Sequence, residues 1–236
     1  MAESPVKFHT YIFRVINRER THNPNRKGSY TLNILAVECC LKLTGAAVML
    51  GDKIFHAQKD LGRKQTSELP KICGSLMNDA GLTWPDLDYV AITNGPGYFT
   101  GIRVGAAYAT GIAYASGAKI IPVSTLELLP QTFRKSRNAA KILTVIYAGH
   151  GFVYASCEGF LEAGEYSHDS ILSWLNENPD AVTISDDPER TALDAEILRV
   201  KPDVISLCEI ARDNMNMAVN PANLKISYYR APQGVN

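Results

Sequence analysis

The first half of the chain places short apolar runs between segments of helical periodicity. Residues 32–37 are mostly apolar, which is typical of a buried strand. Apolar residues recur at helical spacing from Leu69 to Met77 and predict a helix over residues 66–79. The other expected elements are strands at 44–50 and 54–59, which complete an antiparallel meander, a strand at 87–93, a helix at 102–116, a strand at 119–123 and a helix that Ser124 caps and that ends near 134.

The second half repeats this order in a shorter form. The pattern predicts strands at 142–148, 152–159 and 181–185, a helix at 169–178, and a further strand at 204–207 before a last helix. A meander followed by right-handed parallel crossovers is the plan of the ribonuclease H-like fold. Two such subdomains, the second reduced, predict an α/β protein with the actin-like ATPase (ASKHA) fold, which by itself assigns no function.

Charge separates the beginning of the chain from the rest. Residues 1–31 carry six basic residues against two acidic ones, although the whole chain balances 24 Lys and Arg with 24 Asp and Glu. We therefore predict a basic N-terminal extension at 1–31, a first subdomain at 32–123 and a smaller C-terminal subdomain at 124–236. The extension is a solvated tail or the product of a start codon placed too early, or else a segment that contacts RNA or targets an organelle, and the first pair is the simpler interpretation.

Composition narrows the class of protein. Hydrophobic residues make up 46% and charged residues 20%, as in an ordinary globular protein. The neutral balance disfavours a strongly basic nucleic-acid binder. No apolar run approaches the about 18 residues that a membrane helix needs, and no secretory signal is evident, so we expect a cytoplasmic protein without membrane contact. Five cysteines without CxxC spacing, and no histidine pair at helical spacing, predict no metal site.

A glycine-rich segment at residues 94–105 joins a predicted strand to a predicted helix. Gly95 and Gly97 permit unusual backbone angles, Thr100 is placed to cap the helix, and Arg103 falls in its first turn. The loop is either an anion site or a tight turn, and it lacks the spacing of a Walker loop. The candidate loop residues are Gly95, Pro96, Gly97, Phe99, Thr100 and Gly101.

Small residues form a stripe along the helix that follows this loop. Gly101, Gly105, Ala109, Ala113 and Gly117 are spaced by four, so they share one helix face. The stripe packs either on the chain's own sheet or against another subunit, and we favour the subunit interface.

The segment GPGYFTGIRVG at residues 95–105 closely resembles the GPGSFTGxRxG signature of the TsaB (YeaZ) family. The resemblance extends from Asn33 to about Leu129 and continues weakly to the SYYR segment at 227–230. It does not include residues 1–31.

This resemblance implies a scaffold in place of an active enzyme. TsaB-like proteins have the actin-like ATPase fold and pair with the catalytic TsaD subunit and the ATPase TsaE. Their assembly transfers a threonylcarbamoyl group to the adenosine beside the anticodon of tRNAs that read ANN codons. The resemblance therefore implies no cofactor bound by this chain alone, ATP used by the wider complex, tRNA reached only through that complex, and a homodimer when the chain is alone.

The family's pairing surface is formed by two helices, which correspond here to residues 66–79 and 102–116. The resemblance thus implies an interface made of Leu69, Ile72, Cys73, Leu76, Gly101, Arg103, Gly105, Tyr108, Ala109, Ile112 and Ala113.

The sequence independently suggests a lost nucleotide site. An ATPase of this fold needs a carboxylate at the end of the first strand of each half. The first half offers Glu38, whereas Tyr147 stands at the matching position of the second half. We interpret Glu38 and Tyr147 as vestigial nucleotide-site positions and assign no catalytic residue. Further departures from the family pattern are Cys39, Gln65 and Gly149.

Two enzymatic alternatives remain beside the scaffold hypothesis. One is a self-sufficient kinase or ATPase of the actin-like superfamily, which would use Glu38. The other is a cysteine hydrolase, in which Cys39 or Cys40 would need a base such as His150. Apolar packing is the simpler role for both cysteines.

Overall fold

The computed structural model describes residues 31–227 and Tyr229, so the predicted extension at 1–31 lies outside the described residues except for Thr31. Within that described part, no helix is both long and apolar enough to cross a membrane.

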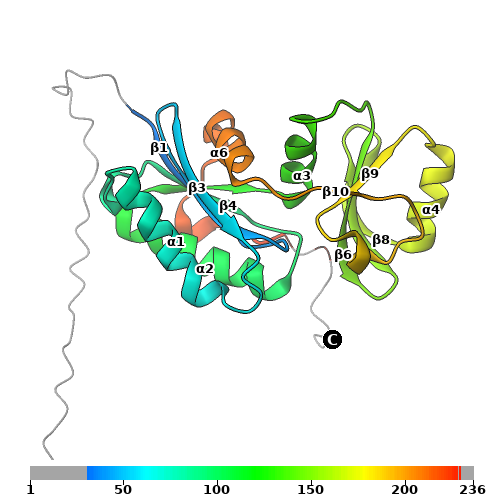
Figure 1. Cartoon of the computed structure of the whole chain (residues 1–236), viewed down its shortest axis with the longest axis horizontal. Coiled ribbons are helices and arrows are strands. Elements are labelled where there is room, and N and C mark those ends of the chain that lie inside the picture. Colours follow the sequence, from blue (N-terminus) through cyan, green and yellow to red (C-terminus); the bar gives the residue numbers. More distant parts are fainter. Residues whose placement is uncertain (1–30, 228, 230–236) are drawn as a thin grey trace, which may run out of the picture. The chain divides into compact units, whose positions relative to one another are not determined.

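The first sheet has five strands in the order β3-β2-β1-β4-β5 (Figure 1). Strands β1, β2 and β3 form an antiparallel meander, and β4 and β5 continue the sheet in parallel with β1. This is the topology that the sequence predicts for the first half. The bounds are β1 (Asn33–Glu38), β2 (Thr44–Leu50), β3 (Lys53–Lys59), β4 (Tyr89–Thr93) and β5 (Lys119–Val123).

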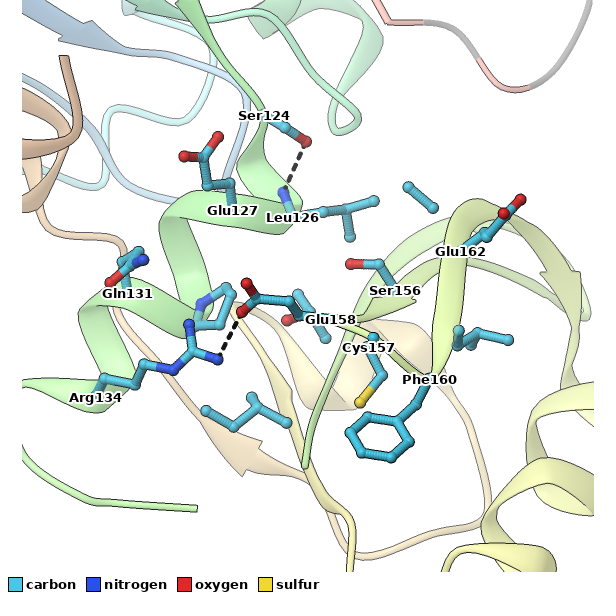
Figure 2. Close-up of a pocket in the computed structure, with 16 residues that line it drawn as sticks. Ser124, Leu126, Glu127, Gln131, Arg134, Ser156, Cys157, Glu158, Phe160 and Glu162 are labelled. Atoms are coloured by element: carbon cyan, nitrogen blue, oxygen red, sulfur yellow. Dashed lines mark hydrogen bonds and ion pairs between the residues drawn. The ribbon is translucent and has the colours of Figure 1, made fainter. Parts of the chain in front are cut away.

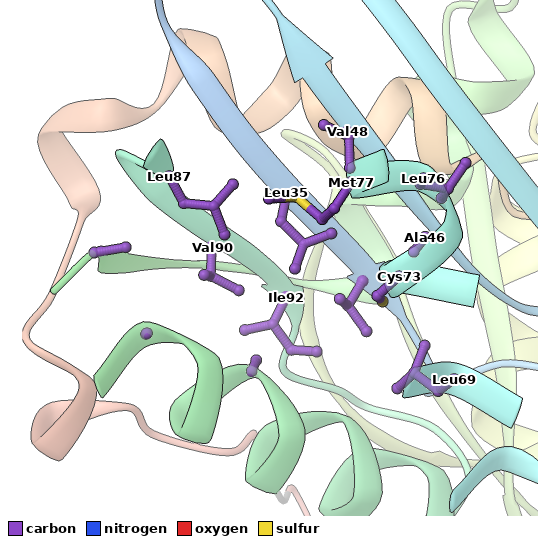
Figure 3. Packing of buried hydrophobic residues seen from close by; sticks show 14 of the residues in the cluster. Leu35, Ala46, Val48, Leu69, Cys73, Leu76, Met77, Leu87, Val90 and Ile92 are labelled. Carbon is purple, nitrogen blue, oxygen red and sulfur yellow. The ribbon is translucent and has the colours of Figure 1, made fainter. Parts of the chain in front are cut away.

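Helices cover both faces of this sheet. Helices α1 (Gln65–Asp79) and α2 (Phe99–Ser116) lie on one face, and α6 (Val204–Asp213) lies on the other (Figure 1). Along β1, Leu35 packs with the α1–α2 side and Ile34 packs with the α6 side. Because both faces are covered, the strand is continuously apolar. Figure 3 shows α1 side chains such as Cys73 and Met77 meeting Leu35 from the sheet.

The second sheet has the order β10-β9-β6-β7-β8. Strands β6, β7 and β8 are antiparallel neighbours, whereas β9 and β10 run parallel with β6. The bounds are β6 (Ile142–Gly149), β7 (Phe152–Cys157), β8 (Leu161–Ser167), β9 (Val182–Ser185) and β10 (Leu198–Arg199), with helices α3 (Thr125–Arg134), α4 (His168–Glu177) and α5 (Pro188–Thr191).

The predicted strand at 204–207 is wrong, because these residues begin helix α6. Asp203 caps this helix by accepting hydrogen bonds from the amides of Ile205 and Ser206. Four residues, 204–207, are too few to decide between a strand and a helix, because a short apolar run is compatible with a strand and with a buried helix. Strands β8 and β10 were not predicted.

The proposed boundary between residues 123 and 124 stays a prediction. Two sheets do lie on either side of it in the sequence. Helix α6, however, falls within the predicted C-terminal subdomain and packs on the first sheet, where Leu207 and Cys208 are fully buried. The chain thus returns to its first sheet after completing the second.

Candidate functional site

The glycine-rich loop is pressed against the segment that follows β1. The amide of Tyr98 donates a hydrogen bond to the carbonyl of Cys40 at 2.7 Å. A Cβ atom on Gly97 would overlap that same carbonyl oxygen, so only glycine permits this approach. Gly95 has φ +103°, and its carbonyl accepts from the amide of Thr125 at 3.0 Å. The glycines therefore serve close backbone packing, and the anion-site interpretation of this loop stays untested.

Helix α2 begins one residue before the predicted cap. Its first residue is Phe99, its N-cap is Tyr98, and no side chain caps it. The predicted capping role of Thr100 is therefore wrong, because Thr100 already lies in the first turn and is exposed. The guanidinium of Arg103 lies 3.6 Å from the ring centroid of Phe99.

Four of the five residues in the stripe are buried against the chain's own sheet, so their assignment to a subunit interface is wrong, whereas Gly117 is the exposed C-cap of α2. A Cβ on Gly101 would overlap the carbonyl oxygen of Cys39. A Cβ on Gly105 would lie 3.0 Å from Cys39 Cβ and 3.1 Å from Ile92 Cδ1. Burial inside the chain likewise removes seven predicted interface residues from any pairing surface: Leu69, Cys73, Leu76, Gly101, Gly105, Ala109 and Ala113.

The remaining predicted interface residues lie nearer the surface. Arg103 is exposed, and Ile72, Tyr108 and Ile112 are half-buried between α1 and α2. The outward side of α2, which we call the outer face of α2, consists of Phe99, Arg103, Ala107, Gly111 and Tyr114, all of them exposed.

Glu38 lies buried at the end of β1, with 1% of its surface exposed. Its Oε1 atom accepts hydrogen bonds from the amides of Cys40 and Leu41 at 2.6 and 2.8 Å. Its Oε2 atom makes no hydrogen bond of normal geometry within the described residues, although the nearby Thr93 hydroxyl acts to lower the Glu38 pKa. Burial is the main cause that raises the pKa of Glu38 to about 7; the charge of Asp186 contributes in the same direction, and hydrogen bonds to the carboxylate oppose it.

Two acidic residues at the end of β9 complete this region, and the sequence analysis missed them. Asp186 Oδ2 accepts a hydrogen bond from the amide of Lys42 at 3.0 Å. Asp187 pairs with Lys42 Nζ at 3.1 Å and accepts from the Tyr98 hydroxyl at 3.2 Å. The available signal was an Asp-Asp pair directly after an apolar run at 182–185.

The two predicted vestigial positions therefore lie in one polar cluster. Arg190 stacks between two rings, 4.6 Å from the Tyr98 centroid and 4.7 Å from the Tyr147 centroid. We call the set of Glu38, Lys42, Tyr98, Tyr147, Asp186, Asp187 and Arg190 the junction, because it connects the first sheet to the second.

Tyr147 does stand on β6 where the sequence analysis places it, but Asp186, after β9, brings a second carboxylate near Glu38. Its Oδ2 atom accepts the hydrogen bond from the Lys42 amide. Within residues 31–227, no group of three or more His, Cys, Asp or Glu side chains is arranged to hold a metal ion.

Both cysteines after β1 are poorly suited to nucleophilic chemistry. Burial raises the pKa of Cys39 to about 12 and the pKa of Cys40 well above its ordinary value. The Cys40 thiol donates to the carbonyl of Thr93 at 3.0 Å. A thiol that is buried and protonated is not a nucleophile, which disfavours the hydrolase alternative.

Comparison with known proteins agrees with this architecture. The protein-family model described as TsaD, tRNA N6-adenosine threonylcarbamoyltransferase, matches residues 54–196, more than half of the chain. A protein of Buchnera aphidicola from Schizaphis graminum, named tRNA threonylcarbamoyladenosine biosynthesis protein TsaB, is 31% identical over 63% of this chain and 67% of its own length. The Escherichia coli protein of the same name is 28% identical over 64% of this chain and 62% of its own length.

Across the first TsaB relatives, the matched region spans between 53% and 67% of the relative's length. Among solved structures, YeaZ from Pseudomonas aeruginosa superposes with a TM-score of 0.65 at 20% identity and covers 84% of this chain and 99% of that one. A second structure from this organism, titled as similar to peptidase YEAZ, has a TM-score of 0.71 at 20% identity and covers 84% of this chain and all of that one. The sequence matches and the shared actin-like fold together establish that this chain belongs to the TsaB (YeaZ) family.

Proposed function

We propose that this chain is a noncatalytic partner subunit in the synthesis of threonylcarbamoyladenosine in tRNA. Its curated TsaB relatives are named as biosynthesis proteins of this modified nucleoside. Proteins named tRNA N6-adenosine threonylcarbamoyltransferase, such as that of Chlorobium limicola, match 41% of the chain at 30% identity. In this proposal the chain pairs with a TsaD-type transferase and works with a TsaE-type ATPase, and it meets tRNA only within the complex.

The junction is the observation that carries this proposal. An ATPase of this fold must admit a magnesium-bound nucleotide between its two halves, with its carboxylates free for metal and water. Here the chain's own groups contact one another across the two halves. Lys42 and Tyr98 from the first half engage Asp186 and Asp187 from the second. A subunit whose halves are held together in this way is suited to support a partner enzyme.

The outer face of α2 is the surface that we propose for pairing. Gly111 has open space around the position of a Cβ, so a neighbouring backbone can approach the helix closely. Tyr114 is 60% exposed and offers a large aromatic contact. Ile72, Tyr108 and Ile112 extend this surface toward α1. Without its partner, the same surface is expected to pair with a second copy of the chain.

One observation favours the alternative of a self-sufficient ATPase or kinase. The buried Oε2 atom of Glu38 makes no hydrogen bond of normal geometry within the described residues, and Asp186 is close enough to raise the Glu38 pKa. This alternative requires tight binding of Mg²⁺-ATP that is lost in Glu38→Ala. Calorimetry on the isolated chain distinguishes the two, and the partner-subunit proposal expects no saturable heat.

Reconstitution tests the proposed function. The TsaD-type and TsaE-type proteins of the same organism are incubated with tRNA, ATP and the threonylcarbamoyl donor, with and without this chain. We expect modified adenosine only when the chain is present. Equal modification without the chain would refute the proposal.

A further inference from the structure

A pocket of about 710 Å³ lies between α3 and the hairpin of β7 and β8, and none of the junction residues lines it. Its volume falls in the range of small-molecule sites. Figure 2 shows Glu127 and Arg134 on the α3 side and Glu158 and Glu162 on the hairpin side.

The pocket carries unbalanced negative charge on both sides. Arg134 Nη2 pairs with Glu158 Oε2 at 2.9 Å, so Glu158 is compensated. Neither Glu127 nor Glu162 has an ion pair to any residue in the described ranges. One carboxylate without an ion pair therefore remains on each side of the pocket, and both Glu127 and Glu162 are exposed at its rim.

The environment of Glu127 favours a positive ligand. Partial desolvation by the surrounding side chains raises the pKa of Glu127, although the residue is still exposed to solvent, and the charge of Glu158 acts in the same direction. Both effects disfavour the ionised carboxylate. A cation beside Glu127 would stabilise that charge, so the pocket is electrostatically suited to bind one.

A buried hydroxyl gives a second, independent indication of a ligand. Thr144 lines the pocket from β6, has none of its surface exposed, and its Oγ1 atom has no hydrogen-bond partner in residues 31–227 and 229. Its register partner on β7 is Ser156, which also lines the pocket. Buried hydroxyls are normally satisfied, so the unpartnered Thr144 hydroxyl marks this wall of the pocket, and the half-buried Ser156 hydroxyl can accept a hydrogen bond from an ammonium group.

The remaining lining supplies apolar contact for an alkyl chain. It includes Leu126, Pro130, Ile142, Phe160, Leu161 and Ala163.

We propose that this pocket binds a linear alkyl diamine. One ammonium group lies beside Glu127 and the other beside Glu162, and the alkyl chain crosses the apolar lining. The Ser156 hydroxyl accepts a hydrogen bond from the ammonium end nearer to it. A diamine matches the pocket better than a monoamine, because the two carboxylates stand on opposite sides.

Isothermal titration calorimetry on the full chain with 1,5-diaminopentane tests the proposal, at low salt and about pH 7, where the amines are charged. We expect saturable binding at one site. Because 1-aminopentane has one charge, its affinity is expected to be about tenfold lower. The amide of Nα-acetyl-lysine, which represents the side chain of a partner protein, is expected to bind as weakly as the monoamine.

Substitutions of the lining residues test whether the diamine binds in this pocket. Glu127→Gln and Glu162→Gln are each expected to weaken the diamine about five- to tenfold. The matched control Glu177→Gln removes an exposed charge from α4 and should leave affinity unchanged. Ser156→Ala removes the proposed hydrogen-bond acceptor and should weaken binding of the diamine.

Three results would overturn the proposal. One is the absence of saturable heat up to about 10 mM diamine. Another is equal affinity for the diamine and the lysine amide, which would remove the need for two carboxylates. The third is a diamine affinity that Glu127→Gln and Glu162→Gln change no more than Glu177→Gln does.

Discussion

The backbone amide of Lys42 donates a hydrogen bond to Asp186 Oδ2 at 3.0 Å, across 144 positions of sequence. Asp186 is 5% exposed, and this contact fastens the segment after β1 to the end of β9. This contact lies beside Glu38, one of the two predicted vestigial positions, because the charge of Asp186 acts on the Glu38 carboxyl.

Substitution of Asp186 tests the strength of this contact. Asp186→Ala removes the acceptor and leaves the Lys42 amide unpaired, so we expect a loss of about 1–3 kcal/mol in the free energy of unfolding. Asp186→Asn keeps an acceptor oxygen and should cost clearly less. Denaturant unfolding of both variants measures the difference. Equal losses would show that the hydrogen bond contributes nothing.

Two glycines of α2 give a matched pair of substitutions. Gly101→Ala should destabilise the chain by about 1–3 kcal/mol or more, because the new Cβ would overlap the Cys39 carbonyl. Gly111→Ala adds its Cβ into open space and should stabilise by up to about 1 kcal/mol through helix propensity. Thermal unfolding followed by circular dichroism compares the two. A stable Gly101→Ala variant would contradict the packing of α2 on its own sheet.

The raised pKa of Glu38 predicts that the free energy of unfolding falls as pH rises. Its carboxyl titrates near 4.5 in the unfolded chain and near 7 in the folded chain. Protonated Glu38 therefore favours the folded state fully below about pH 4.5, and this contribution is lost as pH rises through 7. The pKa difference corresponds to about 3 kcal/mol.

Glu38→Gln isolates this effect, because the amide does not ionise and other titrating groups are shared with the unsubstituted chain. The stability of the variant relative to the unsubstituted chain should rise by about 3 kcal/mol between about pH 4 and pH 8. Guanidinium unfolding across that range provides the values. Parallel stability curves for the two proteins would contradict the raised pKa.

If the outer face of α2 is the pairing surface, a substitution on it should leave the chain folded and weaken its association with the TsaD-type protein. Gly111→Arg places a long charged side chain where a partner backbone would approach, whereas within the chain it meets open space. We expect an unchanged circular dichroism spectrum and at least about tenfold weaker association with the TsaD-type protein. Glu177→Arg on α4 serves as the control and should pair normally. Normal pairing of Gly111→Arg would remove this face from the interface.

The sequence predicted the first sheet well because local patterns determine it. The apolar run of β1, the turn at Gly51 and the helical spacing of α1 each carry their signal within a few neighbouring residues. The cap at Ser124 was also correct, since its side chain accepts from the Leu126 amide. The family signature then identified the fold through a long, specific motif.

Local patterns could not predict which surface covers the small-residue stripe, and they could not predict the contacts of the junction. Spacing shows that Gly101 and Gly105 share a helix face, but it does not show whether a sheet or another subunit covers that face. Asp186 joins Lys42 only through the path of the chain across both sheets. No local pattern specifies a contact over that separation.

Association with the transferase tests the central claim most directly. Light scattering on a sizing column compares the chain alone with the chain mixed with the TsaD-type protein of the same organism. We predict a homodimer that converts to a one-to-one heterodimer on mixing. A chain whose mass stays the same in the presence of the TsaD-type protein would contradict the account of a partner subunit.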